Sequence, residues 1–468
     1  MEPKKNLYFP VEIKVRELLH KLYLSFEASK RGYRSYIGNK SDIFQLISQK
    51  KEKGGVFFPK GGITDQSISL IKKKCDLHSV FDEEMSRSMQ GYLSDGSMLN
   101  FYKHMIKSRF NDLNMKSMDN YYCFNRGILK AARLIFNKKK CKPILLSGHL
   151  KEDLLKSKNL KIFENKKKKI IKDYGNFILF NSDFGILSDL DKAINNYSLL
   201  IKELVSDSSI ASRDIKSATK HLRYKYKSLL NFISFLKQID KKVANMKVMI
   251  RPHPRESVDE WRKIVEEFKN IYIVSPEEDV TAYILAAKGV MHNGCSTSIS
   301  ALLLGKPTAY FLIEDISSDK KFVQEDILKS CIKISNPENF YRWFKTLKTN
   351  SKNYLKKNKY LKNFKKQKLS SEIILDNLDN STINKEKKIE SVIILKKSKI
   401  YYIIKYILSL KFLKKFPWKK EPKISPKIQG GIKKYDVEIY LRVLEKINGI
   451  RKKTKVRQLS DNLIEISQ

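Results

Sequence analysis

Cysteines are few in this chain and lie far apart. The 468 residues contain five, Cys75, Cys123, Cys141, Cys295 and Cys331, and no Cys-x-x-Cys pair occurs. An odd number without close spacing argues against a disulfide framework and against a zinc site. The cysteine usage therefore fits a reducing cytosol.

Long apolar runs and acidic residues are also scarce. No uncharged apolar run approaches the ~20 residues of a membrane-spanning helix, and we expect no secretory signal behind the basic N-terminus. Lys and Arg number 94 against 50 Asp and Glu, a formal net charge of +44. Such a field attracts nucleic acid, anionic lipid head groups or phosphorylated substrates. Drift toward lysine in an AT-rich genome would produce part of the same excess, so the charge alone identifies no partner.

What the chain does contain is a repeated alternation of short apolar runs with segments of helical periodicity. Runs of this kind occur at Asn6–Phe9, Tyr33–Ile37 and Gly55–Pro59 and again at Asn176–Phe180, Val248–Ile250 and Gly289–Met291. Alternation with short loops is typical of a parallel sheet covered by helices on both faces. The sequence thus predicts an α/β fold of two Rossmann-like domains, residues 1–165 and 166–350.

The last part of the chain, residues 351–468, is different because lysine dominates and the alternation fades. We expect a basic, helical C-terminal extension there. Within it, Ile400–Trp418 is apolar and aromatic but interrupted and flanked by lysines. This segment either lies on an anionic membrane surface, where each lysine adds ~1 kcal/mol, or crosses back over the first domain with its lysines in solvent. The sequence leaves both open.

The first candidate site motif is Arg251-Pro252-His253-Pro254-Arg255, directly after an apolar run. Proline on both sides holds His253 extended and blocks an early helix. His253, Arg251 and Arg255 can each donate hydrogen bonds to a phosphate. The alternative is a structural histidine in a turn, but two prolines and two arginines around one histidine are hard to explain by packing.

A second loop lies between the run Gly289–Met291 and a helical segment. Its candidate residues are His292, Asn293, Gly294, Ser296, Thr297 and Ser298. The glycine permits a tight turn, and hydroxyls beside the free N–H groups of a helix start favour an anion. Plain helix capping is the alternative, although one hydroxyl suffices for a cap. Because ligands of open α/β sheets bind beyond the carboxyl ends of the strands, we expect both loops to converge on one anionic ligand.

Acidic residues of the first domain are the candidates for a general base. Asp82 and Glu83 follow the apolar stretch Ser79–Phe81, and a carboxylate there could accept the proton of an acceptor hydroxyl. A solvated acidic helix start is the alternative.

Four further residues are expected on the acceptor side of the same cleft, since they also follow strand-like runs: Glu12, Lys14, Arg16 and Lys60. Asp189 and Asp191 resemble a metal-binding Asp-x-Asp, but they precede a helical pattern and we favour a helix cap. We expect no metal.

The motifs Arg251-Pro252-His253-Pro254, His292–Ser298 and Gly305-Lys306-Pro307 together resemble the nucleotide-binding half of GT-B transferases that build bacterial surface glycans. The His-Pro pair is similar to that of sialyltransferases, Kdo transferases and CDP-glycerol transferases. The segment Tyr8–Glu17 resembles the surface carbohydrate biosynthesis protein family, in which an Asp-Glu-Glu-Gly follows a strand; here Met85 takes the place of the glycine.

The resemblance implies a metal-independent GT-B glycosyltransferase without a cofactor, with its active site between the two domains. The second domain would hold a nucleotide sugar, with a CMP-linked acidic sugar favoured over other CDP- or UDP-linked ones. The acceptor would be a surface polysaccharide or a lipid-linked glycan. The basic protein would work in the cytoplasm, at the anionic inner face of the cytoplasmic membrane, and not on nucleic acid.

Two rival functions remain open. A nucleotide-sugar 2-epimerase of the same fold would need acids that converge on the sugar in one tight cleft. A non-enzymatic nucleic-acid binder would need aromatic residues interleaved with basic ones on one face, whereas most aromatics here fall in strand-like runs.

Overall fold

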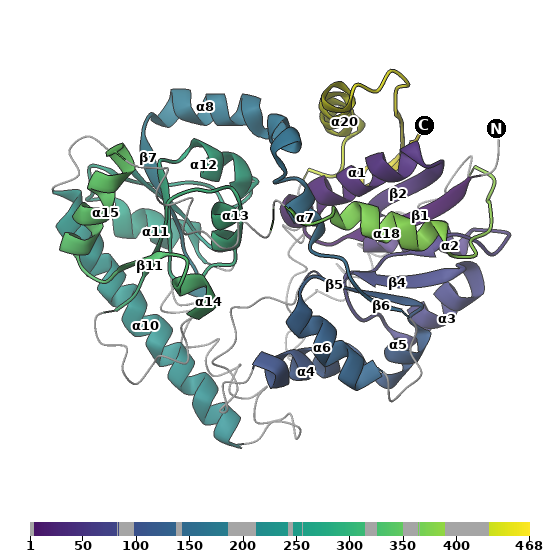
Figure 1. Cartoon of the computed structure of the whole chain (residues 1–468), viewed down its shortest axis with the longest axis horizontal. Helices are drawn as coiled ribbons and strands as arrows, with labels where there is room; N and C mark the ends of the chain where they lie inside the picture. Colours follow the sequence, from purple (N-terminus) through teal and green to yellow (C-terminus); the bar gives the residue numbers. More distant parts are fainter. Residues whose placement is uncertain are drawn as a thin grey trace, which may run out of the picture.

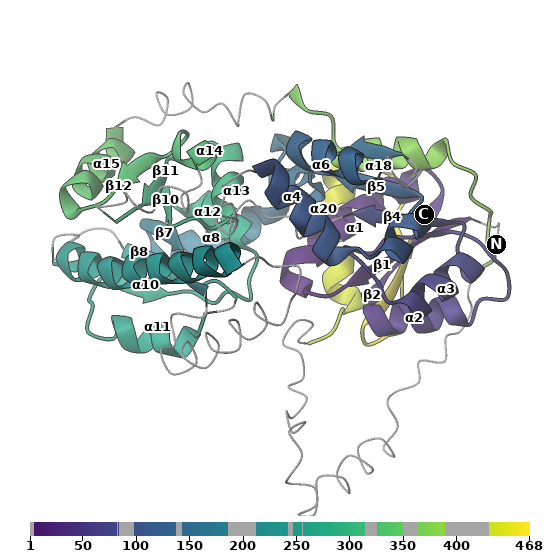
Figure 2. The same cartoon turned by 90° about the horizontal axis from the view of Figure 1, so that it is seen from below.

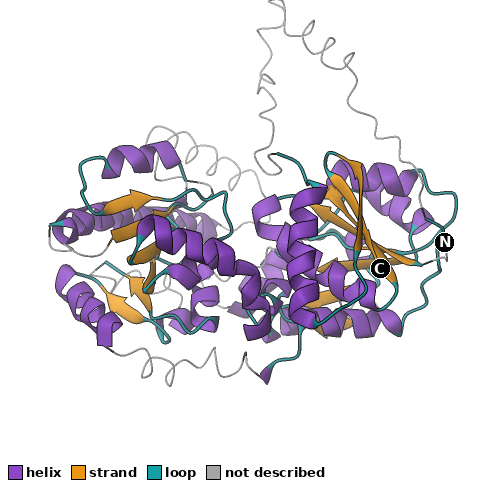
Figure 3. Cartoon of the chain, turned by 90° about the horizontal axis from the view of Figure 1, so that it is seen from above, coloured by secondary structure: helices purple, strands orange, loops and turns teal. Residues whose placement is uncertain are grey.

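The fold is that of a computed structural model, which describes residues 4–81, 83, 98–136, 143–185, 212–241, 247–254, 256–313, 325–349, 364, 366–388 and 430–468. The chain forms two lobes, each built on one sheet, with helices on both faces of each sheet (Figures 1 and 3). The predicted α/β class with two sheets of parallel strands is confirmed.

The first sheet has the order β13-β14-β2-β1-β3-β4-β5-β6. Its strands are β1 (Lys5–Val11), β2 (Tyr33–Asn39), β3 (Val56–Phe57), β4 (Leu77–Phe81), β5 (Asn120–Cys123), β6 (Ile144–Leu146), β13 (Lys455–Ser460) and β14 (Leu463–Ser467). The strands β1 to β6 pair in parallel. Since β2 lies on one side of β1 and β3 on the other, the winding reverses at β1. Such a switch point opens a crevice at the carboxyl ends of β1 and β3.

The helices of this lobe are α1 (Lys14–Lys30), α2 (Lys40–Ser48), α3 (Asp65–Lys74), α4 (Met98–Arg109), α5 (Asp112–Ser117), α6 (Arg126–Phe136), α7 (Leu150–Asp153), the 3-10 helix η3 (Ser157–Phe163), α18 (Ser370–Asp379) and α20 (Lys434–Asn448). The start of α1 is capped from inside, because the Glu17 carboxylate accepts from the backbone N–H groups of Glu12 and Ile13 at 3.0 Å each. Asn39 caps α2 by accepting from the N–H of Asp42 at 2.8 Å. Both caps place a helix start beside the crevice.

The second sheet has the order β12-β11-β10-β7-β8-β9 and is parallel throughout. Its strands are β7 (Phe177–Asn181), β8 (Lys247–Arg251), β9 (Ile271–Ile273), β10 (Gly289–His292), β11 (Thr308–Phe311) and β12 (Ile332–Ile334). Here the winding reverses between β7 and β10. The second crevice is therefore expected at the carboxyl ends of these two strands.

The helices of the second lobe are α8 (Glu164–Tyr174), α10 (Ser212–Asp240), α11 (Val258–Val265), α12 (Val280–Ala286), α13 (Thr297–Leu303), α14 (Glu325–Leu328) and α15 (Pro337–Thr349). The long α10 runs across this lobe (Figure 2). Its Phe232 stacks on Phe180 of β7 at a ring distance of 4.0 Å, in an aromatic core that also contains Trp261. This core packs β7 and β8 against α10 and so positions the loops that follow the two strands.

The C-terminal part corrects one prediction. We expected residues 351–468 to form a helical extension, but β13 and β14 form a hairpin that pairs antiparallel with β2. The strand β2 would otherwise be an open edge, and the hairpin covers it while burying Ile464 and Ile466 completely. The sequence did not reveal this strand, because Lys455–Ser460 mixes charged and apolar residues and lies in a lysine-rich part of the chain. The segment Ile400–Trp418 lies outside the described residues.

A crossing back over the first lobe does occur, earlier in the chain than Ile400. The helix α18 follows the second lobe in sequence and lies on the first (Figure 1). Its start is held by the buried Asp153 carboxylate, which accepts from the N–H groups of Ser370 and Ser371 at 2.8 Å each. No helix in the described part of the chain combines the length and apolar character needed to cross a membrane.

Candidate functional site

The segment behind β1 and the loop behind β8 approach each other. Arg16 lies in the first turn of α1, behind β1, and His253 lies in the loop behind β8. The Arg16 Nη2 atom is 3.5 Å from His253 Nε2. Arg16 is exposed and His253 half-buried. A residue expected on the acceptor side and one expected on the donor side thus approach each other across the two lobes.

The His253 backbone is held in place on both sides. Its N–H donates to Ser182 Oγ at 3.1 Å, and its carbonyl accepts from the N–H of Glu256 at 2.7 Å. Ser182 Oγ in turn donates a short hydrogen bond to the Glu256 carboxylate. The loop after β7 and the loop after β8 are therefore tied together around His253.

Glu256 is a residue that the sequence analysis missed. It is 7% exposed and accepts from Trp261 Nε1 at 2.8 Å, from the N–H of Phe184 at 2.7 Å and from the N–H of Gly185 at 3.0 Å, in addition to Ser182. Burial raises the pKa of Glu256 to about 7, although these donors oppose the rise. In the sequence, Glu256 shows only as an acidic residue directly after the histidine motif. The fold shows that it is buried and holds the loops around His253 through these hydrogen bonds.

Arg251 is used inside the protein. It is 8% exposed, its Nη2 donates to the carbonyls of Pro276 at 2.7 Å and Glu278 at 2.9 Å, and burial lowers its pKa. The guanidinium therefore fixes the loop after β9, which differs from the phosphate contact that we expected. Arg255 lies outside the described residues.

His292 is also placed differently from the expectation of a phosphate ligand. Its side chain is completely buried, Nδ1 accepts from the N–H of Gly294 at 3.1 Å, and the ring packs 4.6 Å from Tyr310. Burial lowers its pKa to about 3, so the ring is neutral near pH 7. Its role in this geometry is to shape the turn at Gly294, whose φ of 115° favours glycine.

Asn293 joins the two loops at the second switch point. Its Oδ1 accepts from the N–H of Asp183 at 2.7 Å, which links the end of β10 to the end of β7. Asp183 also pairs with Lys225 of α10 at 3.3 Å. The crevice expected from the strand order is thus built from residues of both flanking strands.

The three hydroxyls at the start of α13 differ in exposure. Ser296 is exposed, Thr297 half-buried and Ser298 completely buried. Ser296 occupies the N-cap position without a side-chain capping hydrogen bond. Its hydroxyl is therefore not used as a plain cap, and Ser296 and Thr297 remain the candidates to meet a ligand. Burial raises the pKa of Cys295, which fits a packing role.

Glu83, the expected base, is buried in an ionic cluster of the first lobe. Its side chain is 7% exposed, and its Oε1 lies 2.8 Å from His20 Nε2 and 3.9 Å from Lys21 Nζ. Burial alone would raise the pKa of Glu83, but Lys21 and His20 outweigh it and hold the pKa at about 2. A carboxylate this acidic is a poor proton acceptor near neutral pH. Asp82 lies outside the described residues.

The ionic cluster continues outward to Glu12. Lys21 Nζ lies 2.8 Å from Glu17, and Lys60 Nζ lies 3.1 Å from Glu17 and 2.9 Å from Glu12. The Glu12 side chain is 38% exposed. Glu12 is thus the carboxylate of this chain of charges that reaches solvent. Lys14 turns away, since its Nζ donates to the carbonyl of Gly431 at 2.6 Å.

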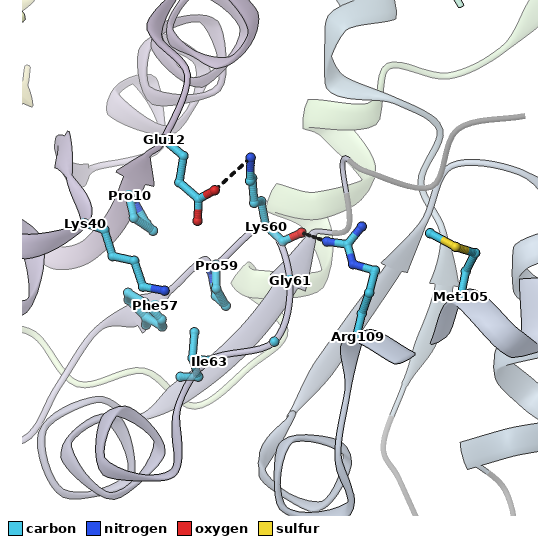
Figure 4. A pocket seen from close by; sticks show the side chains of 11 residues that line it. Pro10, Glu12, Lys40, Phe57, Pro59, Lys60, Gly61, Ile63, Met105 and Arg109 are labelled. Atoms are coloured by element: carbon cyan, nitrogen blue, oxygen red, sulfur yellow. Dashed lines mark hydrogen bonds and ion pairs between the residues drawn. The ribbon is translucent and has the colours of Figure 1, made fainter. Parts of the chain in front are cut away.

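A cavity opens at the first switch point, beside Glu12 (Figure 4). Its volume is ≈ 460 Å³. The lining comes from the ends of β1 and β3 and from the helices α2 and α4: Pro10, Glu12, Lys40, Phe57, Pro59, Lys60, Gly61, Gly62, Ile63, Met105 and Arg109. Glu12 is its single carboxylate among the described residues. Nor do those residues contain a group of three or more His, Cys, Asp or Glu side chains that could hold a metal ion.

Comparisons with known proteins find no matching family model and no matching curated sequence. Solved structures similar to this chain include S. aureus MnaA in a co-structure with UDP, at 12% identity, 81% coverage of this chain, 96% of the other and a TM-score of 0.44. A variant of the wall teichoic acid polymerase TagF soaked with CDPG shares 14% identity over 81% and 89%, at a TM-score of 0.44. The UDP-GlcNAc 2-epimerase of Neisseria meningitidis bound to UDP-GlcNAc shares 12% identity over 81% and 100%, at a TM-score of 0.40. Likenesses this distant assign no function to the chain.

Proposed function

We propose that the protein is a glycosyltransferase that moves a sugar from a nucleotide-activated donor to a glycan acceptor between the two lobes. The observation that carries the proposal is the approach of Arg16 to His253 within 3.5 Å. Each residue follows a strand beside the switch point of its own sheet, which is where open α/β sheets bind ligands. One ligand placed there contacts both lobes.

The donor phosphate is proposed to lie against His253, Ser296 and Thr297. His253 is held by Ser182 and Glu256, and the hydroxyl of Ser296 is not used for capping. Arg16 adds a positive charge from the opposite lobe. Hydrogen-bond donors and cations fixed before the reaction stabilise the negative charge that develops on a leaving phosphate.

Glu12 is proposed as the base in place of Glu83. The acceptor hydroxyl attacks the anomeric carbon, the bond from that carbon to the phosphate oxygen breaks, and the hydroxyl proton moves to the Glu12 carboxylate. Glu12 suits this role because it is 38% exposed and lines the cavity, whereas Glu83 is 7% exposed and paired with His20. Lys60, 2.9 Å from Glu12, holds the carboxylate in place.

The finer assignments follow the resemblance of the His253 motif. The favoured donor is a CMP-linked acidic sugar. The acceptor is a surface polysaccharide or a lipid-linked glycan. The protein acts at the anionic inner face of the cytoplasmic membrane. The net charge of +44 supports a negatively charged surface as the working place.

The test is release of nucleotide from a panel of CMP-, CDP- and UDP-linked sugars by the purified chain, with and without glycan acceptors. One donor should be turned over faster with an acceptor, and His253→Ala should remove this turnover. His104→Ala is the matched control, since His104 is exposed on α4. Turnover that persists at the wild-type rate in His253→Ala contradicts the proposal. Interconversion of a nucleotide sugar without any acceptor would instead support an epimerase.

A further inference from the structure

The cavity of ≈ 460 Å³ at the first switch point has a size typical of a small-molecule site. It lies at the ends of β1 and β3, next to the proposed base Glu12. A molecule bound there would present a hydroxyl to Glu12. The side chains that line the cavity therefore determine which acceptor the protein binds.

One side of the cavity is apolar. Phe57, Ile63, Pro10 and Pro59 line this side, whereas Met105 lies on the other side, beyond Arg109 (Figure 4). An apolar wall of this kind suits the C–H face of a sugar ring and offers no hydrogen bonds to it. Selectivity must then come from the polar side chains.

Those polar side chains are mainly cationic. Lys40, Lys60 and Arg109 carry three positive charges against the single carboxylate of Glu12. Lys60 is engaged with Glu12 at 2.9 Å and with Glu17 at 3.1 Å. The excess charge in the cavity therefore comes from Lys40 and Arg109.

Lys40 is the cation whose ammonium group has no ion pair or hydrogen bond within the described part of the chain. It is the first residue of α2 and half-buried, and its side chain extends into the cavity above Phe57 (Figure 4). A half-buried ammonium in a concave site is poorly solvated, so an anionic ligand there gains a strong, charge-assisted hydrogen bond.

Arg109 lies at the opposite wall, where the loop that contains Lys60, Gly61 and Gly62 packs closely against it. Its Nη2 donates to the carbonyl of Lys60 at 3.1 Å. A Cβ atom at Gly61 would stand 2.5 Å from Arg109 Nη2, and one at Gly62 would stand 2.1 Å from the Arg109 carbonyl oxygen. The position of Gly62 thus requires glycine, because the clash is with backbone, whereas a side chain at Gly61 would displace the end of Arg109; the close packing places a second positive charge on the cavity.

We infer that this cavity selects an acidic acceptor, a sugar-sized molecule whose carboxylate or phosphate group binds Lys40 while a hydroxyl faces Glu12. The role of this molecule as an acceptor rests on the proposed function; the anion site itself does not. Carboxylate and phosphate share the chemistry that Lys40 recognises, and the experiment separates them.

The experiment titrates the full chain with three probes, followed by ligand-observed NMR: methyl β-D-glucuronide with a carboxylate, glycerol 3-phosphate with a phosphate, and the neutral methyl β-D-glucoside. At least one acidic probe should bind more tightly than the neutral one. Lys40→Gln should weaken that acidic probe about tenfold, as expected for loss of a hydrogen bond to a charged group, and Lys40→Arg should restore most of the affinity. Lys51→Gln, at an exposed lysine just behind α2, is the matched control and should bind as the wild type does.

Several results would overturn the inference: no preference for an acidic probe, unchanged binding by Lys40→Gln, or an equal loss in Lys51→Gln. Displacement of the acidic probe by an excess of nucleotide would also overturn it, because it would make the cavity part of the donor site. No donor is needed for these titrations. A protein that binds the acidic probe through Lys40 but turns over no nucleotide sugar would retain the anion site and lose the proposed function.

Discussion

Arg16 and His253 are separated by more than two hundred residues in the chain, yet Arg16 Nη2 lies 3.5 Å from His253 Nε2. Each stands behind a strand next to the switch point of its own sheet. In the proposed function, the pair is the place where a ligand of one lobe meets the other lobe, and the positive charge of Arg16 favours an anionic ligand there.

Replacing Arg16 tests this meeting point. Arg16→Gln should lower kcat/KM for the nucleotide sugar about tenfold, as expected for loss of a hydrogen bond to a charged group, and Arg16→Lys should lose less. Arg133→Gln, at an exposed arginine of α6, is the control. If Arg16→Gln and the control have equal kcat/KM, Arg16 does not contact the donor.

Glu256 should matter for both stability and the histidine loop. Glu256→Ala leaves the donors of Ser182, Trp261, Phe184 and Gly185 without their buried acceptor. We expect a loss on the order of 3 kcal/mol in the free energy of unfolding, measured with urea, and a loss of donor turnover. Glu267→Ala, an exposed acid beyond α11, should change neither. A stable Glu256→Ala with wild-type turnover would refute the anchoring role.

Acid sensitivity should follow from the burial of His292. Its pKa in the folded protein is about 3, below the 6.5 of an exposed histidine. Between these values the unfolded chain binds a proton that the folded chain does not, so stability is complete above pH 6.5 and falls with pH through this window. The slope for one such group is up to ~1.4 kcal/mol per pH unit.

His292→Asn keeps an acceptor for the N–H of Gly294 and removes the titration. Unfolding by urea at several pH values between 4 and 7 should therefore show a shallower loss of stability in His292→Asn than in the wild type. Parallel curves would mean that His292 does not titrate as its burial requires.

The C-terminal hairpin should be an integral part of the first lobe. Ile464 is completely buried in β14, and Ile464→Ala should lower the free energy of unfolding by about 3 kcal/mol. Ile439→Ala, at a side chain of α20 that is 49% exposed, should have little effect. Equal free energies of unfolding for the two variants would show that the hairpin does not belong to the core of the first lobe.

Much of the fold could be predicted from the sequence because buried parallel strands are continuous apolar runs between helical segments. The runs at Asn6–Phe9 and Val248–Ile250 lie in β1 and β8. The hairpin at Lys455–Ser467 was missed because its first strand mixes charged and apolar residues, and because its formation depends on pairing with β2, whose edge it covers.

The candidate site was predictable only as a set of loops. Sequence spacing places His253 behind a strand, but it does not show that Arg251 faces two backbone carbonyls or that His292 is buried. Glu83 has the right residue type, yet contacts with His20 and Lys21 make it a weak base. Lys40 carries no signal in the sequence as a ligand-binding residue, because the cavity that it lines is formed by segments distant in sequence.

The central claim, a nucleotide-binding cleft shared by both lobes, is tested most directly by thermal unfolding with CMP, CDP and UDP. One nucleotide should raise the Tm of the wild type by several degrees at saturation. The shift should shrink in both His253→Ala, from the second lobe, and Arg16→Gln, from the first. A Tm that no nucleotide raises, or a full shift retained in both variants, would contradict the account.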